Sequence, residues 1–173
     1  MALKIAINGY GRIGRGLHRQ LLDVKDIEIV AINSRADAKS HGYLLKHDSL
    51  YGKCNADISV EEGNLKVNGK IVYVYQIHKP EDIDWKRHDV DVVIEATGGF
   101  TTKIDGEKHL KAGAKKVLIT APCKDAEIPH IVMGVNEKND DSAKYDIFSN
   151  ASCTTNCLGP VMKVLNDEFK IEM

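Results

Sequence analysis

A cysteine stands at the start of an expected helix, within the segment Ser149–Cys157, which reads SNASCTTNC. Asn150 and Ser152 are both favourable N-cap residues. A cysteine in the first helical turn, here Cys153, lies at the positive end of the helix, which favours the thiolate and makes the sulfur nucleophilic. The alternative is a small buried apolar residue, which is the usual role of a lone cysteine.

The same segment holds a second thiol, and a metal site has to be considered. Cys153 and Cys157 are four positions apart and would share one helix face. No histidine pair and no second cysteine pair at zinc spacing accompanies them. We therefore expect no metal.

Three glycines, Gly9, Gly11 and Gly14, match the G-x-G-x-x-G pattern between a strand-like run and a helix-like one. Gly9 permits the sharp turn, Gly11 lets the backbone approach a pyrophosphate, and Gly14 lets the helix pack close to the strand. The free N–H groups at the helix start then bind the phosphates. A plain structural turn is the alternative, and the surrounding pattern favours dinucleotide binding.

The end of the second expected strand, Asn33-Ser34-Arg35, bears on the kind of dinucleotide. An acid roughly 20 residues past the glycine loop would bind the ribose diol of NAD. Ser34 removes the charge that would repel a 2′-phosphate, and Arg35 could pair with one, so NADP and NAD both remain open. In the alternative interpretation Arg35 is a solvated loop cation and Asp37 covers the ribose.

The elements that must position these residues alternate as strand, helix and strand. This order predicts an α/β fold of the Rossmann type, doubly wound around a mainly parallel sheet. We expect strands at Lys4–Asn8, Ile27–Ile32, Asp91–Ala96, Lys116–Thr120, Ile131–Met133 and Tyr145–Phe148, and helices at Gly11–Leu22, Asp37–Lys46, Lys103–Lys111 (ending at Gly113) and about Ser152–Phe169.

An antiparallel insertion is expected between residues 57 and 75. The runs Asp57–Glu62, Leu65–Asn68 and Ile71–Tyr75 are strand-like, and Asn68-Gly69 is a favoured two-residue hairpin turn. Pro80–Trp85 is expected to form a turn.

Composition limits the class of protein. The 173 residues carry 24 Lys and Arg against 25 Asp and Glu, and this balance makes nucleic acid an unlikely partner. No window approaches the ~18 apolar residues that a membrane-spanning helix needs. Four cysteines are too sparse for a disulfide framework, so a cytoplasmic location with reduced thiols is expected.

The two motifs together resemble those of a known family. Asn8–Arg15 resembles the cofactor loop of phosphorylating glyceraldehyde-3-phosphate dehydrogenase, and Ala151–Cys157 resembles its catalytic cysteine motif. Further motifs between them fall in family order: His47-Asp48-Ser49, Glu95-Ala96-Thr97-Gly98, Ala112–Val117 and Met133–Asn136. The resemblance covers essentially the whole chain, and the cysteine motif is its more specific part.

The resemblance implies that NAD(P) oxidises a sugar phosphate aldehyde bound to Cys153, which leaves a thioester on Cys153. Inorganic phosphate then cleaves the thioester and forms an acyl phosphate. Ser152 and Thr154 would lie beside a phosphate. Cofactor contacts are implied for the residues Gly9, Gly11, Arg12, Ile13, Gly14, Asn33, Ser34, Arg35, Thr97, Gly98 and Thr120. The family is a homotetramer of glycolysis and gluconeogenesis. The alternatives are an erythrose-4-phosphate dehydrogenase-like enzyme and a nucleotide-binding module without catalysis.

Some positions depart from the family pattern. The family has an acid where Ser34 stands, an Arg-Asp-Pro stretch where His78-Lys79-Pro80 stands, and usually a phenylalanine at Tyr10. Its histidine base would fall beyond Met173. The resemblance thus implies a dinucleotide-binding domain at 1–150 and the first helix of a catalytic domain at 151–173, a fragment expected to bind cofactor with little or no turnover.

Overall fold

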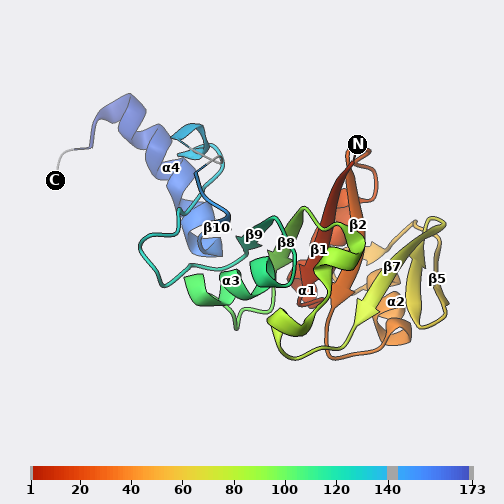
Figure 1. The fold of residues 1–173 in the computed structure, drawn as a ribbon. Coiled ribbons are helices and arrows are strands. Elements are labelled where there is room, and N and C mark those ends of the chain that lie inside the picture. Colours follow the sequence, from red (N-terminus) through yellow and green to blue (C-terminus); the bar gives the residue numbers. More distant parts are fainter. Residues whose placement is uncertain (1, 140–143, 172–173) are drawn as a thin grey trace.

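The computed structural model describes residues 2–139 and 144–171, and at its centre is an eight-stranded sheet (Figure 1). The strands lie in the order β10-β9-β8-β1-β2-β7-β6-β5. In chain order they are β1 (Leu3–Asn8), β2 (Ile27–Asn33), β5 (Ile58–Glu61), β6 (Asn64–Val67), β7 (Lys70–Tyr75), β8 (Val92–Glu95), β9 (Lys116–Ile119) and β10 (Ile147–Ser149). Neighbouring strands from β10 to β7 pair parallel, whereas β6 pairs antiparallel with both β7 and β5.

Helical segments pack on both faces of this sheet. The helical segments of the described residues are α1 (Arg12–Leu21), α2 (Ala38–Lys46), η1 (Pro80–Asp82), η2 (Trp85–His88), α3 (Lys103–Lys111), η3 (Glu137–Asn139) and α4 (Cys153–Phe169), where η marks a 3₁₀ helix. Ile5 and Ile7 of β1 share a core with Leu17 of α1 and Leu45 of α2. Ala6 points to the opposite face, where its core includes Trp85. The doubly wound α/β class expected from the sequence is confirmed.

The antiparallel insertion forms around the expected turn. Asn68 and Gly69 connect β6 to β7 with φ values of 48° and 80°, the left-handed pair that a tight hairpin requires. A second small hairpin, β3 (His47–Asp48) with β4 (Gly52–Lys53), follows α2. Helix α3 has the expected bounds, and Gly113 follows its end at φ +103°, where a Cβ would lie 2.6 Å from the Lys86 Cβ.

Three expectations about local structure were wrong. Ile131–Met133 forms no strand: only His130 bridges to Ser149, and the Val132 N–H is taken by the Asn136 side chain at 2.7 Å. The last strand begins at Ile147 rather than Tyr145. The expected turn at Pro80–Trp85 contains η1 and the first residue of η2.

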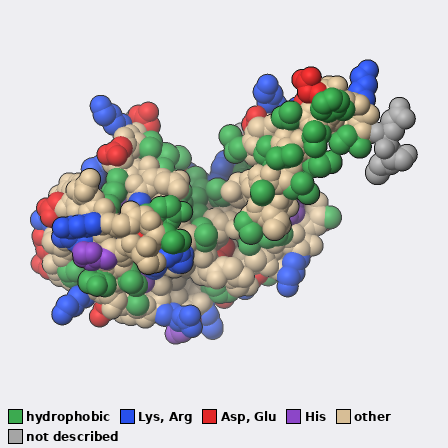
Figure 2. Space-filling model, turned by 180° about the vertical axis from the view of Figure 1, so that it is seen from behind, with side chains coloured by type: hydrophobic (Ala, Val, Ile, Leu, Met, Phe, Trp, Pro, Cys, Tyr) green, Lys and Arg blue, Asp and Glu red, His purple; other side chains and the backbone are tan. Residues whose placement is uncertain are grey.

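Helix α4 extends away from the body of the molecule (Figure 1). None of its residues is buried. Figure 2 shows hydrophobic side chains gathered along it, and the exposed ones include Leu158, Val161, Met162, Val164, Leu165 and Phe169. Of the expected second segment, 151–173, residues 172 and 173 lie outside the described part. Among the described residues, no helix has both the length and the hydropathy needed to cross a membrane.

Candidate functional site: a cleft at the strand ends

A cleft of about 320 Å³ opens at the carboxyl ends of three neighbouring strands. The last residues of β1, β2 and β8 are Asn8, Asn33 and Glu95, and Asn8 is in register with both of the others. Because β2 and β8 flank β1 on opposite sides, the chain reverses its direction of sheet growth here. Doubly wound folds bind their ligands at this switch point. The cleft lining comprises Asn8, Gly9, Asn33, Ser34, Arg35, Gln76, Ile77, His78, Thr97 and Phe100.

The glycine loop has the geometry that its residue types predict. Gly9 has φ +95°, and a Cβ on it would lie 2.5 Å from the Ala96 carbonyl carbon. A Cβ on Gly14 would lie 2.4 Å from the Gly9 carbonyl oxygen, whereas one on Gly11 would meet nothing within 4 Å. The loop is therefore closed against the protein at its two ends and open to the outside at its centre.

The start of α1 carries a positive potential that no acidic side chain of its own first turn offsets. Ile13 is exposed there. Arg12 extends from the same turn to Asp48, with 3.3 Å between its Nη1 and the Asp48 Oδ2. Backbone N–H groups of Tyr51 and Leu50 donate to that carboxylate and lower the pKa of Asp48 to about 2. Asp48 thus stays charged and holds Arg12 beside the loop.

The end of β2 presents Ser34 and Arg35 to the cleft. Within the described residues, the Arg35 side chain makes no ion pair, and its carbonyl accepts a hydrogen bond from the Gln76 side chain at 2.9 Å. Asp37 instead caps α2, because its Oδ1 accepts from the Ser40 N–H at 2.8 Å. That hydrogen bond lowers the pKa of Asp37. The carboxylate nearest to the cleft along this segment is therefore engaged in capping a helix.

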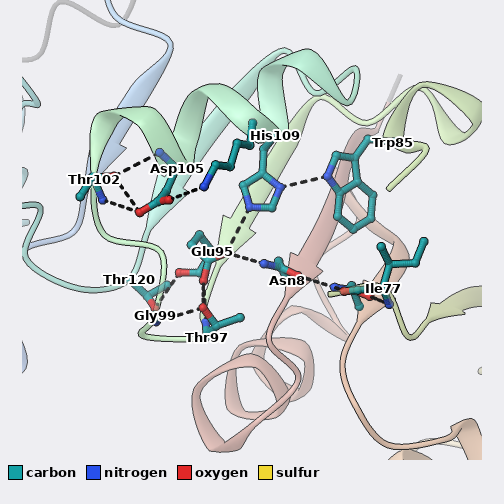
Figure 3. A network of polar contacts seen from close by, with 12 residues as sticks. Asn8, Ile77, Trp85, Glu95, Thr97, Gly99, Thr102, Asp105, His109 and Thr120 are labelled. Atoms are coloured by element: carbon teal, nitrogen blue, oxygen red, sulfur yellow. Dashed lines mark hydrogen bonds and ion pairs between the residues drawn. The ribbon is translucent and has the colours of Figure 1, made fainter. Parts of the chain in front are cut away.

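The other wall of the cleft is a turn that follows β8. The Thr97 N–H donates to the Glu95 Oε1 at 2.7 Å, its hydroxyl donates to the same oxygen, and the Gly99 N–H donates to that hydroxyl at 3.1 Å (Figure 3). Gly98 sits between them with φ +73°. Thr120, on the neighbouring strand end, donates its N–H and hydroxyl to the Glu95 carbonyl at 2.9 and 3.0 Å.

A series of buried polar side chains begins at Asn8 in the cleft lining and continues into the protein, and the sequence did not reveal it. It links Asn8, Glu95, His109 and Trp85 by side-chain hydrogen bonds (Figure 3). These residues are at most 2% exposed. The available signal was a charged residue, Glu95, that ends an otherwise apolar strand, together with a histidine inside the following helix.

The cysteine motif lies at the start of α4. Ser152 is the N-cap, and its Oγ accepts from the Thr155 N–H at 2.9 Å. Cys153 is the first helical residue, and both it and Thr154 are exposed. Ala151 precedes the cap with φ +56°. The expectation left open between a buried and an accessible thiol is thus resolved in favour of an accessible one.

The structure brings part of the expected site together. Of the expected residues, Gly9, Asn33, Ser34, Arg35 and Thr97 line the cleft. The lining does not include Gly11, Arg12, Ile13, Gly14, Gly98, Thr120, Ser152, Cys153 or Thr154. Among the described residues, no three His, Cys, Asp or Glu side chains gather as metal ligands. All four cysteines are free thiols.

Comparison with known proteins places this cleft in a family. Residues 3–103 match the family model "Glyceraldehyde 3-phosphate dehydrogenase, NAD binding domain". The chain is 50% identical over 172 residues to glyceraldehyde-3-phosphate dehydrogenase 1 of Bacillus subtilis (strain 168), covering 99% of this chain and 51% of the relative. It is 50% identical over 171 residues to the glyceraldehyde-3-phosphate dehydrogenase of Geobacillus stearothermophilus, with 99% and 51% covered.

A relative from a chloroplast gives a similar result. The chloroplastic glyceraldehyde-3-phosphate dehydrogenase of Chondrus crispus is 48% identical over 173 residues, with 99% of this chain and 42% of the relative covered. The chain spans about half the length of the curated relatives it matches. With most of its length matched by the NAD-binding domain, the chain belongs to the glyceraldehyde 3-phosphate dehydrogenase family.

Proposed function

We propose that the cleft binds NAD(P), with the pyrophosphate on the amides at the start of α1. The observation that carries this proposal is the glycine loop, which is closed against the protein at Gly9 and Gly14 and open at Gly11. Open backbone next to a helix N-terminus without an acidic first turn suits a diphosphate. The adenosine half would lie along Ser34 and Arg35, and the nicotinamide half along the turn Thr97–Gly99, which contains Gly98, with Thr120 on the neighbouring strand end.

We further propose that NADP is accepted beside NAD. Ser34 brings no negative charge to the position where a 2′-phosphate would lie, and the Arg35 side chain has no ion-pair partner among the described residues. Asp37, the alternative ribose ligand, caps α2 through Ser40. These contacts support an adenosine wall that tolerates a phosphate.

For the whole enzyme we propose the phosphorylating oxidation of glyceraldehyde 3-phosphate to 1,3-bisphosphoglycerate. The Cys153 sulfur adds to the aldehyde carbon, and oxidation at that carbon leaves a thioester. Inorganic phosphate cleaves the thioester, which releases the acyl phosphate and the thiol. Bound NAD(P) supplies the hydride acceptor. The exposed position of Cys153 at the first residue of α4 supports this role, and the capped helix start offers N–H groups to a developing oxyanion.

Further proposals concern the two parts of the chain, its partners and its location. We keep 1–150 as the dinucleotide-binding domain and 151–173 as the first helix of a catalytic domain, and the exposed apolar face of α4 is consistent with a further layer covering it. A homotetramer and a cytoplasmic location are proposed for the whole enzyme. The four free thiols agree with a reducing compartment.

Equilibrium binding tests the central part of the proposal. Residues 1–173 are titrated with NAD, NADP and, as a control without a diphosphate bridge, adenosine. We expect saturable binding of both dinucleotides and much weaker binding of adenosine. We also expect no aldehyde oxidation by residues 1–173 alone, since no hydrogen bond joins Cys153 to a histidine in the described part. Absence of dinucleotide binding by the folded chain would refute the proposed function.

A further inference from the structure

We propose that Glu95 is a positioning residue that fixes both walls of the cleft, one through each of its carboxylate oxygens. The inference rests on the proposed function in so far as the cleft is the dinucleotide site. Glu95 ends β8 and is 2% exposed, so its carboxylate lies under the cleft floor and not in the lining. It therefore acts on a ligand only through the groups that it holds.

The first oxygen holds the Thr97 turn. Oε1 of Glu95 accepts both the N–H and the hydroxyl of Thr97, and the hydroxyl oxygen in turn accepts the Gly99 N–H at 3.1 Å. A three-residue turn is thereby tied to one carboxylate oxygen by two direct bonds and one indirect bond. The wall proposed for the nicotinamide half takes its shape from these contacts.

The second oxygen reaches the opposite wall through two side-chain amides. Oε2 of Glu95 accepts the Asn8 Nδ2, and the Asn8 Oδ1 accepts the Asn33 Nδ2 at 2.7 Å. Asn33 then binds both backbone groups of Ile77: its Oδ1 accepts the Ile77 N–H and its Nδ2 donates to the Ile77 carbonyl, each at 2.9 Å. Ile77 lines the cleft beside His78, on the adenosine wall.

The Glu95 carboxylate decides which groups donate and which accept along this series of hydrogen bonds. A carboxylate only accepts, so Asn8 must present its NH₂ group to Glu95 and its oxygen to Asn33. Asn33 must then present NH₂ to Asn8, which leaves its oxygen for the Ile77 N–H. The acceptor oxygen of Glu95 thus sets the orientation of two amides and, through them, of a backbone group on the far wall.

His109 and Trp85 complete the set of hydrogen bonds around the carboxylate (Figure 3). The Trp85 indole N–H can only donate, and it lies 3.1 Å from the His109 Nδ1, so Nδ1 is the acceptor and Nε2 carries the proton. His109 Nε2 then donates to the Glu95 Oε2 at 3.1 Å. Four donor groups converge on Glu95, and each of its oxygens receives two.

An isosteric substitution tests this assignment. Glu95→Gln replaces one acceptor oxygen by an NH₂ group, which must face N–H donors on either side. We expect amide hydrogen exchange to accelerate at least tenfold at both Thr97 and Ile77. The Val117 N–H, which donates to the Asp146 carbonyl at 2.8 Å in the same sheet, should keep its wild-type rate. Glu61→Gln, the same charge change at an exposed site, should leave all three amides unchanged.

A second variant covers the case in which Glu95→Gln does not fold. Asn8→Ser shortens the link between Glu95 and Asn33 and leaves the Thr97 contacts in place. It should accelerate exchange at Ile77 and not at Thr97. A wild-type exchange rate at Ile77 in either folded variant would overturn the proposal, as would equal acceleration at Val117, which would mean a general loosening of the fold.

Dinucleotide titration completes the test. Folded Glu95→Gln should bind NAD at least tenfold more weakly than Glu61→Gln does. Unchanged NAD affinity in Glu95→Gln would overturn the positioning role. The exchange measurements need no ligand, so they still decide whether Glu95 orders the two walls if the wild-type chain fails to bind NAD, a result that would instead refute the proposed function.

Discussion

Gly14 packs so closely on Gly9 that a Cβ at position 14 would lie 2.4 Å from the Gly9 carbonyl oxygen. The same Cβ would lie 3.0 Å from the Ile7 side chain. This contact joins the first turn of α1 to the loop that follows β1, and it fixes the position of the helix N-terminus relative to the cleft. The third glycine of the motif is therefore a packing requirement, and its effect on ligand binding is indirect.

The first prediction concerns this contact. Gly14→Ala should lower the melting temperature and weaken dinucleotide binding at least tenfold, because the Cβ meets rigid backbone and α1 must shift. Gly16→Ala is the matched control: it lies in the same helix, and its Cβ would meet nothing within 4 Å. It should be neutral or stabilise the chain by up to about 1 kcal/mol. Thermal unfolding and NAD titration of both variants check this, and equal behaviour would contradict the packing argument.

A second prediction concerns cofactor preference. Arg35→Ala should weaken NADP binding about 10- to 150-fold, since one charge-assisted hydrogen bond is worth roughly 1.5–3 kcal/mol. NAD affinity should change less than about twofold. Arg87→Ala removes an exposed arginine of η2 that does not line the cleft and serves as the control. The two affinities are measured by calorimetry, and a parallel loss for NAD and NADP would rule out a phosphate contact.

A third prediction concerns stability at acidic pH. Burial lowers the pKa of His18 to about 4, whereas the unfolded chain has an ordinary value near 6.5. Between about pH 6.5 and 4, His18 is therefore protonated in the unfolded state and neutral in the folded state. The free energy of unfolding should therefore fall as the pH drops from about 6.5 to 4, by about 3 kcal/mol from this group alone.

The variants for this prediction are His18→Gln and His47→Gln. The first should flatten the loss of stability between about pH 6.5 and 4, and the second, at an exposed histidine, should leave it unchanged. Urea unfolding at several pH values provides the measurement. Burial also lowers the pKa of His41, so a residual slope is expected in His18→Gln. A slope identical to that of the wild type would show that His18 is not the titrating group.

A fourth prediction concerns the thiols. Cys153 and Cys157 are both exposed on α4, one turn apart, but only Cys153 is the first residue of the helix. Free N–H groups at a helix start stabilise negative charge on a nearby sulfur. Iodoacetamide should therefore modify Cys153 several-fold faster than Cys157, and faster than the half-buried Cys54. Peptide mapping after short exposure gives the rates, and equal rates at Cys153 and Cys157 would remove the support for a nucleophile.

Local sequence patterns predicted the parts of the fold that depend on interactions between residues close in sequence. The Asn68-Gly69 hairpin and the bounds of α3 follow from turn chemistry and from a glycine after the last helical turn. The run Ile131–Met133 has strand-like residue types, but its pairing with β10 stops after the Ile131 N–H, which donates to the Ser149 carbonyl at 2.8 Å, because the Asn136 side chain takes the Val132 N–H. A strand needs a neighbour, and residue types alone do not supply one.

The candidate site divides in the same way. The glycine motif could be predicted because its residues are close in sequence and because a Cβ on Gly9 or Gly14 would meet backbone atoms. The hydrogen bonds that join Glu95, His109 and Trp85 could not be predicted, because α3 and η2 bring the last two side chains to β8 by tertiary packing. For Asp37 the sequence left two roles open, and the contact with Ser40 identifies the helix cap.

The central claim, that a dinucleotide sits with its diphosphate on the start of α1, is tested most directly by NMR titration of the labelled chain. The account predicts that NAD shifts the amide signals of Gly11, Arg12 and Ile13 together with Thr97. A second cavity, of about 440 Å³ and lined by residues including Leu21, Val24 and Ile27, provides the internal control. Shifts confined to that cavity, with the α1 amides unmoved at saturation, would contradict the account.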